Sequence, residues 1–358
     1  MIIGIIKEQK DPRVALVPAI AKKLIDKEQV KVWVEKEAGT GASSSDEDYQ
    51  AAGAAIKSRS EVFQQADILV AIHPPSQDEL GMCKSQAVVM SLFQPFFNKT
   101  IGEELKAMDL RAFSFDMIPR TSLAQSMDVL SSMASIAGYR AVLSAAYHFP
   151  SYFPMLITAA GSIPPAKALI LGAGVAGLQA IATAKRLGAK VEAFDVRAAA
   201  KEEVESLGAK FVEVEGANDD KAAGGYAVEQ TEEYKRRQRE LVHERAMRAD
   251  IIITTAQLRG RKAPILVEER TVEGMKKGSI IVDLAASTGG NCALTQNDKI
   301  IQHKGITIIG DSNLPAQMPI DASLLFSNNF YNYVKLMIKE GALHLDFEDE
   351  IIAKSYIC

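Results

Sequence analysis

The sequence is poor in cysteine and histidine, the residues that form disulfides and hold most structural metals. Its 358 residues include three cysteines, Cys83, Cys292 and Cys358, which lie far apart and form no Cys-x-x-Cys pair. The five histidines are equally scattered, and none lies four residues from another, the spacing that would place two ligands on one helix face. We therefore expect reduced cysteines, no disulfide framework and no metal.

An excess of positive charge and long apolar runs are also missing. The formal net charge is -4, so the chain offers no basic field for nucleic acid. The longest stretches without Asp, Glu, Lys or Arg, 141–166 and 168–184, are interrupted by proline, histidine or glycine, and neither supplies the roughly 20 continuous apolar residues of a membrane helix. The N-terminus reaches Lys7 without the pattern of a signal peptide. We expect a cytoplasmic protein that does not itself insert into a membrane.

What the sequence does contain is a regular alternation of short apolar runs with longer amphipathic stretches. This alternation favours parallel α/β sheets, and the chain is longer than one hydrophobic core usually supports. We predict two Rossmann-like, doubly wound domains. The first is discontinuous, with residues 1–130 plus 322–358, and the second contains residues 131–321. The expected strands are 2–6, 30–34, 68–72, 88–92, 111–114, 168–171, 190–195, 211–214, 251–254, 280–283 and 307–309.

Three longer segments complete the expected architecture. Residues 125–147 have a helical pattern with small side chains and mark the boundary between the domains. Residues 321–341 predict an apolar helix that returns to the first domain. Residues 215–248 are too long for a simple Rossmann connection and dense in charge, so they are either a solvated helix with a loop or a functional lid.

A glycine-rich turn in the second predicted domain indicates a dinucleotide site. Gly172-x-Gly174-x-x-Gly177 follows a predicted strand and opens a predicted helix, the context that gives this motif its mechanism. The first glycine permits a tight turn, the second lets the backbone approach a pyrophosphate, and the third allows the helix to pack closely on the strand. Val175 and Ala176 begin the helix, whose N-terminal N–H groups attract phosphate. We predict that the chain binds NAD(H).

The strand after this helix ends at Asp195, about 20 residues beyond the turn. A carboxylate there accepts hydrogen bonds from ribose hydroxyls and repels the 2′-phosphate of NADP, which favours NAD. Val196 and Arg197 follow directly, and Arg197 could accept a 2′-phosphate, so the residues alone leave some room for NADP.

Two further strand ends lie at the edge where a nucleotide crevice forms. Thr255, Ala256 and Gln257 follow the strand 251–254 and either line that crevice or form a plain buried strand end. The glycines of the segment 283–290 either approach the nicotinamide or simply turn the chain.

Several motifs, taken together, give the sequence a family resemblance. They are Lys7-Glu-x-x-x-Pro-Arg13-Val-Ala-Leu-Val-Pro18, the glycine turn, Asp195-Val-Arg197, Gly224-Gly-Tyr226-Ala and Asp283-Leu-Ala285. These resemble the alanine dehydrogenase and proton-translocating nicotinamide nucleotide transhydrogenase superfamily. More narrowly, Pro119-Arg120-x-x-x-Ala-Gln125-Ser-Met-Asp128-x-Leu-Ser131-Ser and Gly161-x-Ile-Pro-Pro-Ala166 are similar to the NAD(H)-binding first domain of the transhydrogenase alpha subunit.

Chemistry separates the two branches of this superfamily. An alanine dehydrogenase moves a proton as well as a hydride, and the resemblance would place a Lys near Ile72 and a His near Gln94 for that purpose. Here those regions read Ala-Ile-His-Pro-Pro and Leu-Phe-Gln-Pro, and the acidic residue expected before Gly289 is absent. Hydride transfer between two nicotinamides requires alignment of the rings but no general acid or base. The resemblance therefore implies direct hydride transfer between NADH and NADP+, coupled to proton translocation.

The resemblance also implies roles for individual residues. Gln125 would hydrogen-bond the nicotinamide end of NAD(H), Arg120 and Asp128 would pair to brace that loop, and Ser131 would orient the carboxamide. Spacing alone favours an ordinary surface ion pair beside a helix cap. In the segment 217–230, Gly225 and Tyr226 resemble the tip of a mobile loop that closes over the nucleotide.

The partners implied are a second copy of the chain, as a homodimer, and membrane-bound transhydrogenase subunits that carry the NADP(H) site and the proton channel. The chain would then be peripheral to the inner (plasma) membrane through its partner. Two other classes stay open. One is an alanine dehydrogenase-like enzyme with Arg13 and Lys7 as carboxylate binders, and the other is an NAD-sensing protein without chemistry.

Overall fold

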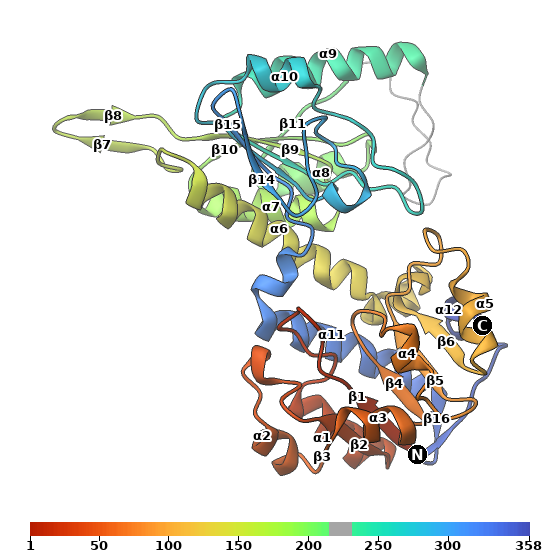
Figure 1. The fold of residues 1–358 in the computed structure, drawn as a ribbon. Helices are drawn as coiled ribbons and strands as arrows, with labels where there is room; N and C mark the ends of the chain where they lie inside the picture. Colours follow the sequence, from red (N-terminus) through yellow and green to blue (C-terminus); the bar gives the residue numbers. More distant parts are fainter. Residues whose placement is uncertain (215–230) are drawn as a thin grey trace. The chain divides into compact units, whose positions relative to one another are not determined.

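The computed structural model describes residues 1–214 and 231–358 and divides into two compact units (Figure 1). Unit 1 contains Met1–Met133 and Pro315–Cys358, and unit 2 contains Ala134–Leu314. Breaks in the chain were expected after residues 130 and 321, which is close to these positions. Both units are doubly wound α/β folds, as predicted.

Unit 1 is built on a six-stranded parallel sheet with the order β3-β2-β1-β4-β5-β6. The direction of winding reverses between β1 and β4. The strands are β1 (Ile2–Ile5), β2 (Lys31–Glu35), β3 (Ala55–Lys57), β4 (Ile68–Val70), β5 (Val88–Ser91) and β6 (Arg111–Ser114). The helices are α1 (Pro18–Glu28), α2 (Asp46–Ala51), α3 (Arg59–Gln65), α4 (Gln77–Leu80), α5 (Ile101–Ala107), α11 (Pro319–Val334) and α12 (Glu350–Ser355). The edge strand β3 was not expected.

Helix α11 brings the C-terminal part of the chain back into unit 1, as its apolar pattern predicted. Phe115 makes edge-on contacts with three rings of this helix, at centroid distances of 5.2 Å to Phe326, 6.4 Å to Phe330 and 6.1 Å to Tyr333. The helix ends at Val334 rather than near 341, because the chain then tightens into a 3-10 turn and a short hairpin, β16 (Ile338–Lys339) and β17 (Ala342–Leu343).

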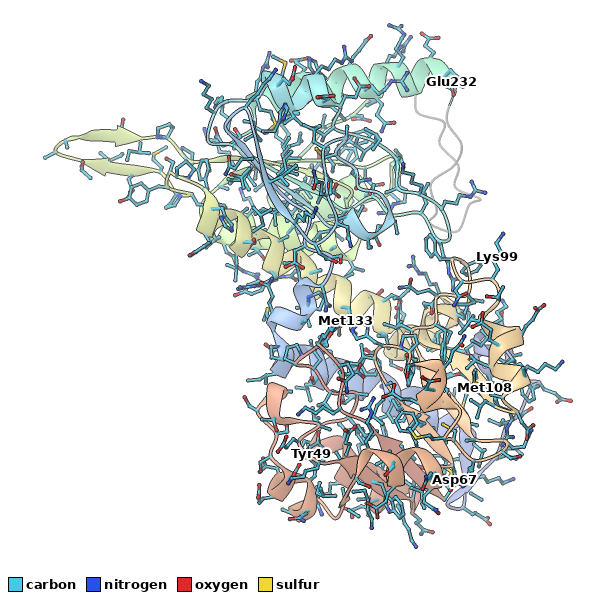
Figure 2. The ribbon with its side chains drawn as sticks, in the orientation of Figure 1. Tyr49, Asp67, Lys99, Met108, Met133 and Glu232 are labelled. Carbon is cyan, nitrogen blue, oxygen red and sulfur yellow. The ribbon has the colours of Figure 1, made fainter. Side chains whose placement is uncertain are left out.

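Tyr49 shows how the loops of unit 1 are fixed to its core (Figure 2). Its side chain is fully buried, and its hydroxyl donates a hydrogen bond of 2.6 Å to the carbonyl of Leu16. Burial raises the pKa of this phenol well above its usual value. The hydroxyl therefore stays protonated and acts as a donor.

Unit 2 is built on a seven-stranded sheet with the order β11-β10-β9-β12-β13-β15-β14, which reverses its winding between β9 and β12. The parallel strands are β9 (Lys167–Leu171), β10 (Lys190–Phe194), β11 (Lys210–Phe211), β12 (Ile251–Thr254), β13 (Ile280–Asp283) and β15 (Ile306–Ile309). Each was predicted. The antiparallel edge strand β14 (Ile300–His303) was not.

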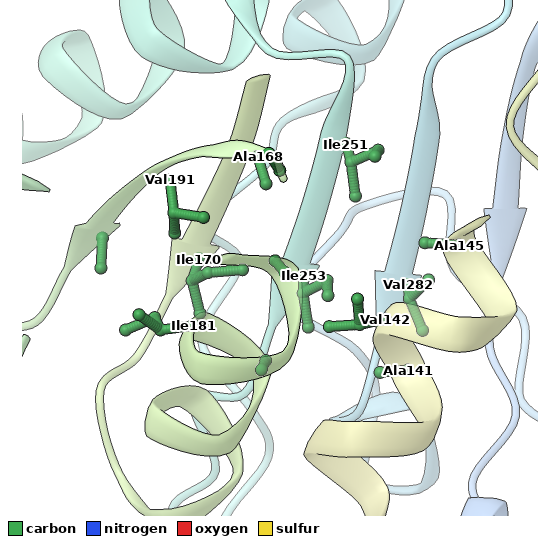
Figure 3. Packing of buried hydrophobic residues seen from close by; sticks show 14 of the residues in the cluster. Ala141, Val142, Ala145, Ala168, Ile170, Ile181, Val191, Ile251, Ile253 and Val282 are labelled. Atoms are coloured by element: carbon green, nitrogen blue, oxygen red, sulfur yellow. The ribbon is translucent and has the colours of Figure 1, made fainter. Parts of the chain in front are cut away.

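Alternate residues of these strands supply two cores, one on each face of the sheet. Ala168 and Ile170 belong to the core beneath helices α6 (Val129–His148), α7 (Val175–Arg186) and α8 (Ala200–Ser206), part of which is drawn in Figure 3. Leu169 and Leu171 belong to the opposite core, beneath α9 (Glu232–Arg248) and α10 (Glu269–Gly274). This double burial is why the strands are apolar at nearly every position.

Helix α6 is long and apolar enough to cross a membrane, judged by length and composition alone. Its Ala141, Val142 and Ala145 are nevertheless buried against the sheet of unit 2 (Figure 3). A Cβ atom at Gly138 would lie 2.1 Å from the carbonyl oxygen of Ala176, so only glycine allows α6 to approach α7 this closely. These contacts are those of a packed core helix.

A two-stranded hairpin, β7 (Leu156–Thr158) and β8 (Gly161–Ile163), extends from the rest of unit 2 (Figure 1). Large apolar side chains lie in it and just before it with much of their surface exposed: Tyr152, Met155 and Ile157 are 55%, 55% and 77% exposed. The hairpin was not predicted. We refer to it below as the hairpin arm.

The charged segment 215–248 is partly explained by helix α9. Pairs of opposite charge four residues apart, such as Arg236 with Glu240, cover its outer side, while Val242 and Ala246 are buried. Residues 232–248 are therefore a solvated helix with one packed face. The mobile loop expected at 217–230, with Gly225 and Tyr226, lies outside the described residues.

Candidate nucleotide-binding site

The glycine turn lies in unit 2, at the C-terminal edge of the sheet where the winding reverses. Gly172 has a φ of +104°, and a Cβ atom there would lie 2.4 Å from the hydroxyl of Thr255. A Cβ at Gly177 would lie 1.9 Å from the carbonyl oxygen of Gly172, so α7 can pack on β9 only with glycine. A Cβ at Gly174, by contrast, would meet no described atom within 4 Å. The backbone at Gly174 is therefore open to a ligand.

Helix α7 begins directly after this open position. Gly174 is its N-cap and supplies no side-chain hydrogen bond to the first turn. Val175, the first residue of the helix, is 45% exposed. An uncapped N-terminus that faces open space suits an anion such as a pyrophosphate, which can take hydrogen bonds from the N–H groups of the first turn.

Asp195 lies beside the turn, where its carboxylate is already engaged. One oxygen accepts a hydrogen bond of 2.7 Å from the backbone N–H of Ala173, and both oxygens accept bonds from the Arg197 guanidinium at 3.0 and 3.1 Å. The hydrogen bond from Asp195 raises the pKa of Arg197. Val196, between them, packs against the core. Ribose hydroxyls would have to replace part of the Arg197 contact to reach Asp195.

The ends of β12 and β13 lie on the other side of the turn. The Thr255 hydroxyl donates to the carbonyl of Gly172 at 3.2 Å and so ties the glycine turn to the loop after β12. Gln257 is exposed, and its side-chain amide donates to the carbonyl of Leu284 at 2.7 Å. Ala256 is held by Asn291, a fully buried residue that the sequence did not suggest. Its role could not be predicted because its partners lie up to 35 residues away.

Unit 1 contains the segment with Arg120, Gln125, Asp128 and Ser131. Residues Ser122–Met127 form a 3-10 helix that is anchored by the buried side chains of Ala124 and Met127, and Gln125 is exposed between them. The carbonyl of Ser126 accepts hydrogen bonds of 2.9 and 3.2 Å from the side-chain amides of Asn329 and Asn332 on α11. The sequence did not suggest these two braces.

Asp128 is held differently from what we expected. Its carboxylate accepts hydrogen bonds from the backbone N–H of Ser131 at 2.9 Å and from the Ser131 hydroxyl at 2.6 Å. Asp128 is therefore the N-cap of α6, the position where aspartate satisfies the N–H of the third helical residue. Arg120 is exposed, and among the described residues no ion pair joins it to Asp128.

Four ionisable residues gather at the reversal point of the other sheet, in unit 1. Asp11 accepts hydrogen bonds from Arg13 at 2.6 Å and contacts Nε2 of His73 at 2.8 Å, and Glu8 accepts from the backbone N–H of Ile72 and His73. Burial raises the pKa of Glu8. Burial would also raise the pKa of Asp11, but the bonds from His73 and Arg13 outweigh it and lower that pKa. Lys7 instead pairs with Glu37 at the surface, 3.4 Å away.

In the described part of the chain, one group of side chains has metal-ligand spacing. It consists of Glu269 and Glu273 on α10 and His303 on β14. The two carboxylates are exposed, and Glu273 already forms ion pairs with Lys304 at 2.6 Å and with His303 at 3.4 Å. These pairs account for the cluster without a metal.

Two family models match the chain, one for each half. The model described as alanine dehydrogenase/PNT, N-terminal domain, matches residues 4–137, and the model described as alanine dehydrogenase/PNT, C-terminal domain, matches residues 141–358. Together they cover almost all of the chain and bear out the resemblance inferred from its motifs.

Individual proteins agree with these models. The first segment of the NAD(P) transhydrogenase alpha subunit of Rhodospirillum rubrum is 44% identical over 99% of this chain and 95% of its own length. The crystal structure of transhydrogenase from Sinorhizobium meliloti is similar with a TM-score of 0.91 and 40% identity, covering 99% of this chain and 98% of that one. An L-alanine dehydrogenase structure is similar with a TM-score of 0.82 and 26% identity, covering 99% and 94%.

Proposed function

Because this chain belongs to the alanine dehydrogenase/PNT family, we propose that it is the NAD(H)-binding subunit of a proton-translocating NAD(P) transhydrogenase. The observation that carries the proposal is the glycine turn, with its open backbone at Gly174 before an uncapped helix, in a chain 44% identical over nearly its whole length to a transhydrogenase subunit. The turn would hold the pyrophosphate of NAD(H), and Asp195 would take the adenosine ribose.

The proposed reaction moves one hydride and no proton between the two nucleotides. C4 of NADH gives a hydride to C4 of NADP+ bound on a partner subunit, so that NADH becomes NAD+ and NADP+ becomes NADPH. This transfer needs the two rings to be held about 3–3.5 Å apart and requires no general acid or base. The residues that act on NAD(H) are therefore those that bind and orient it.

We assign this orienting role to the segment of unit 1 that resembles the family's nicotinamide-positioning loop. Its Gln125 is exposed on a short helix that Ala124 and Met127 anchor, and so is available to hydrogen-bond the nicotinamide end. Asp128 and Ser131 hold each other as a helix cap, which keeps the segment in place. Arg120, exposed and without that pairing to Asp128, is assigned to the same loop. The loop tip with Gly225 and Tyr226 is assigned to closing over the nucleotide.

The partner subunits would carry the NADP(H) site and the proton channel, and would hold this chain at the inner (plasma) membrane. The proton gradient would then drive the exchange toward NADPH. The single nucleotide fingerprint of this chain supports the division of labour, because hydride exchange between NADH and NADP+ requires a second nucleotide site.

The hairpin arm supports the homodimer. It exposes Met155 and Ile157 in a strand pair that leaves the body of unit 2, and a second copy of the chain would cover these apolar side chains. Ile157→Glu should therefore turn the dimer into a monomer in sedimentation experiments. Ile300→Glu is the matched control, because Ile300 is an exposed isoleucine of the same unit that lies outside the arm. A wild-type monomer, or a dimer that both variants retain, would refute the assignment.

The experiment that tests the function is hydride transfer from NADH to an oxidised nicotinamide analogue. The full chain is mixed with a transhydrogenase NADP(H)-binding domain, and a parallel assay supplies the chain alone with alanine and NAD+. Activity in the mixture alone supports the transhydrogenase. Activity with alanine alone assigns the chain to the dehydrogenase branch. NADH binding without either activity supports a nucleotide sensor.

A further inference from the structure

A buried carboxylate closes β13 without taking part in the fingerprint. Asp283 is fully buried, and five neutral groups donate to its two oxygens. Oδ1 accepts from the Thr254 hydroxyl at 2.9 Å and the Ala285 N–H at 3.0 Å. Oδ2 accepts from the N–H groups of Asn291 and Cys292 at 2.7 and 3.0 Å and from the Thr295 hydroxyl at 2.6 Å. The carboxylate therefore gathers the whole loop after β13 around itself.

The two glycines of this loop fit the same arrangement. Gly290 has a φ of +81°, and a Cβ atom there would lie 2.8 Å from Oδ2 of Asp283. Gly289 has a φ of +104° and completes the turn. The sequence left open whether these glycines approach the nicotinamide or turn the chain. In the structure they allow the loop to wrap closely around the Asp283 carboxylate.

Asn291 carries this order across to the loop that follows β12. Its Oδ1 accepts from the N–H of Ala256 at 3.0 Å, and its Nδ2 donates to the carbonyls of Ala256 at 2.9 Å and of Pro264 at 2.8 Å. The side-chain amide thus pairs with both backbone groups of Ala256 as a strand residue would, and it also holds the far end of the loop 256–264. Asn291 is itself fully buried.

We propose that Asp283 and Asn291 form a positioning pair that fixes the loop 256–264 for the nicotinamide half of NAD(H). The argument depends on which half of the sheet they occupy. Asp195, assigned to the adenosine ribose, ends β10, whereas Asp283 and Asn291 order the ends of β12 and β13, on the other side of the reversal point. A dinucleotide spans that point, so its nicotinamide half lies on the side of this pair. The inference rests on the proposed function.

The test compares two probes, NADH and 5′-AMP, by calorimetry on the full chain. Asn291→Ala releases both ends of the loop and should weaken NADH binding by about tenfold or more, because three hydrogen bonds that hold the loop are lost. Binding of AMP, which has no nicotinamide half, should stay within about twofold. Asn297→Ala is the matched control, because Asn297 is exposed in the same unit and should leave both affinities unchanged.

A milder pair of variants keeps the proposal testable if Asn291→Ala fails to fold. Thr295→Val removes one donor to Asp283 without changing the shape of the side chain, and Thr295→Ser keeps the hydroxyl. We expect NADH affinity to fall by about threefold in the first and to be restored in the second, with AMP unaffected in both.

The outcomes separate this proposal from the proposed function. Unchanged NADH affinity in Asn291→Ala, or in Thr295→Val where only that variant folds, overturns the positioning role. An equal loss of NADH and AMP affinity overturns it as well, because a merely structural role would affect both probes. If the wild-type chain binds neither probe, the proposed function fails first and takes the inference with it.

Discussion

Replacing Asp195 with alanine should weaken NADH binding by about 10- to 100-fold. The carboxylate holds the Ala173 N–H of the glycine turn at 2.7 Å, and the proposed function assigns it the adenosine ribose. Each hydrogen bond to a charged acceptor contributes about 1.5–3 kcal/mol, and 1.4 kcal/mol corresponds to a factor of ten in affinity. The ion pair with Arg197 adds less, because that side chain is 30% exposed.

The same variant should change the cofactor preference. Without Asp195 the guanidinium of Arg197 loses its carboxylate partner beside the ribose, where it can meet a 2′-phosphate. The ratio of NADPH to NADH affinity should therefore rise, even as NADH binds more weakly. Fluorescence titrations with both reduced nucleotides measure the two dissociation constants.

Asp250→Ala is the matched control for this substitution. Asp250 likewise accepts a hydrogen bond from the backbone of β9, from the N–H of Lys167 at 2.9 Å, and pairs with a cation, Lys276, but at the opposite edge of the sheet. Both variants should lower the free energy of unfolding by about 1–3 kcal/mol. Only Asp195→Ala should weaken NADH binding. Unchanged NADH affinity in Asp195→Ala would show that the nucleotide lies elsewhere.

Three further substitutions test other regions of the structure. Gln125→Asn should slow hydride transfer in the reconstituted mixture by about tenfold or more and change NADH affinity by less than about twofold; equal losses in both would contradict its positioning role. Gly177→Ala should abolish NADH binding and lower the melting temperature, since the new Cβ would lie 1.9 Å from the Gly172 carbonyl, and retained binding at full stability would contradict that packing. Asp11→Asn should lower the free energy of unfolding by about 3–5 kcal/mol at pH 7, because it breaks a buried pair with Arg13. The pKa of Asp11 is lowered on folding from an unfolded value of 3.8, so its contribution is fully present well above that pH and is lost as the pH falls through and below it. Denaturant titrations at neutral and acid pH should therefore show the gap between wild type and Asp11→Asn narrowing in acid; a constant gap would refute the assignment.

The elements that could be predicted from sequence are those buried on both sides. Strand β9 is apolar at four consecutive positions, Ala168 to Leu171, and the glycine turn marks its end, so strand, turn and helix follow from one another. Strand β14 escaped prediction because it is an edge strand in which Ile300 is exposed, which leaves no continuous apolar run. The hairpin arm escaped for the same reason, since it contributes nothing to the cores of unit 2.

The site divides in a similar way into local and distant relationships. The roles of the three glycines follow from the covalent structure of the turn, and the cap formed by Asp128 and Ser131 has the three-residue spacing of an N-cap, which the sequence displays. The pairing of Asp195 with Arg197 was adjacent in sequence, yet its strength depends on burial. The Asn291 contacts join residues 27 and 35 positions apart, and no local pattern encodes such a contact.

The return of α11 to unit 1 sets an order of events during synthesis. Residues 134–314 of unit 2 are contiguous, so this unit can acquire its whole sheet as soon as it has emerged from the ribosome. Unit 1 begins earlier but must wait, because Phe115 remains without Phe326, Phe330 and Tyr333 until the last stretch of the chain has been made. The half that is translated first is thus completed last, and its exposed aromatic surface is the form of this chain that a chaperone would meet.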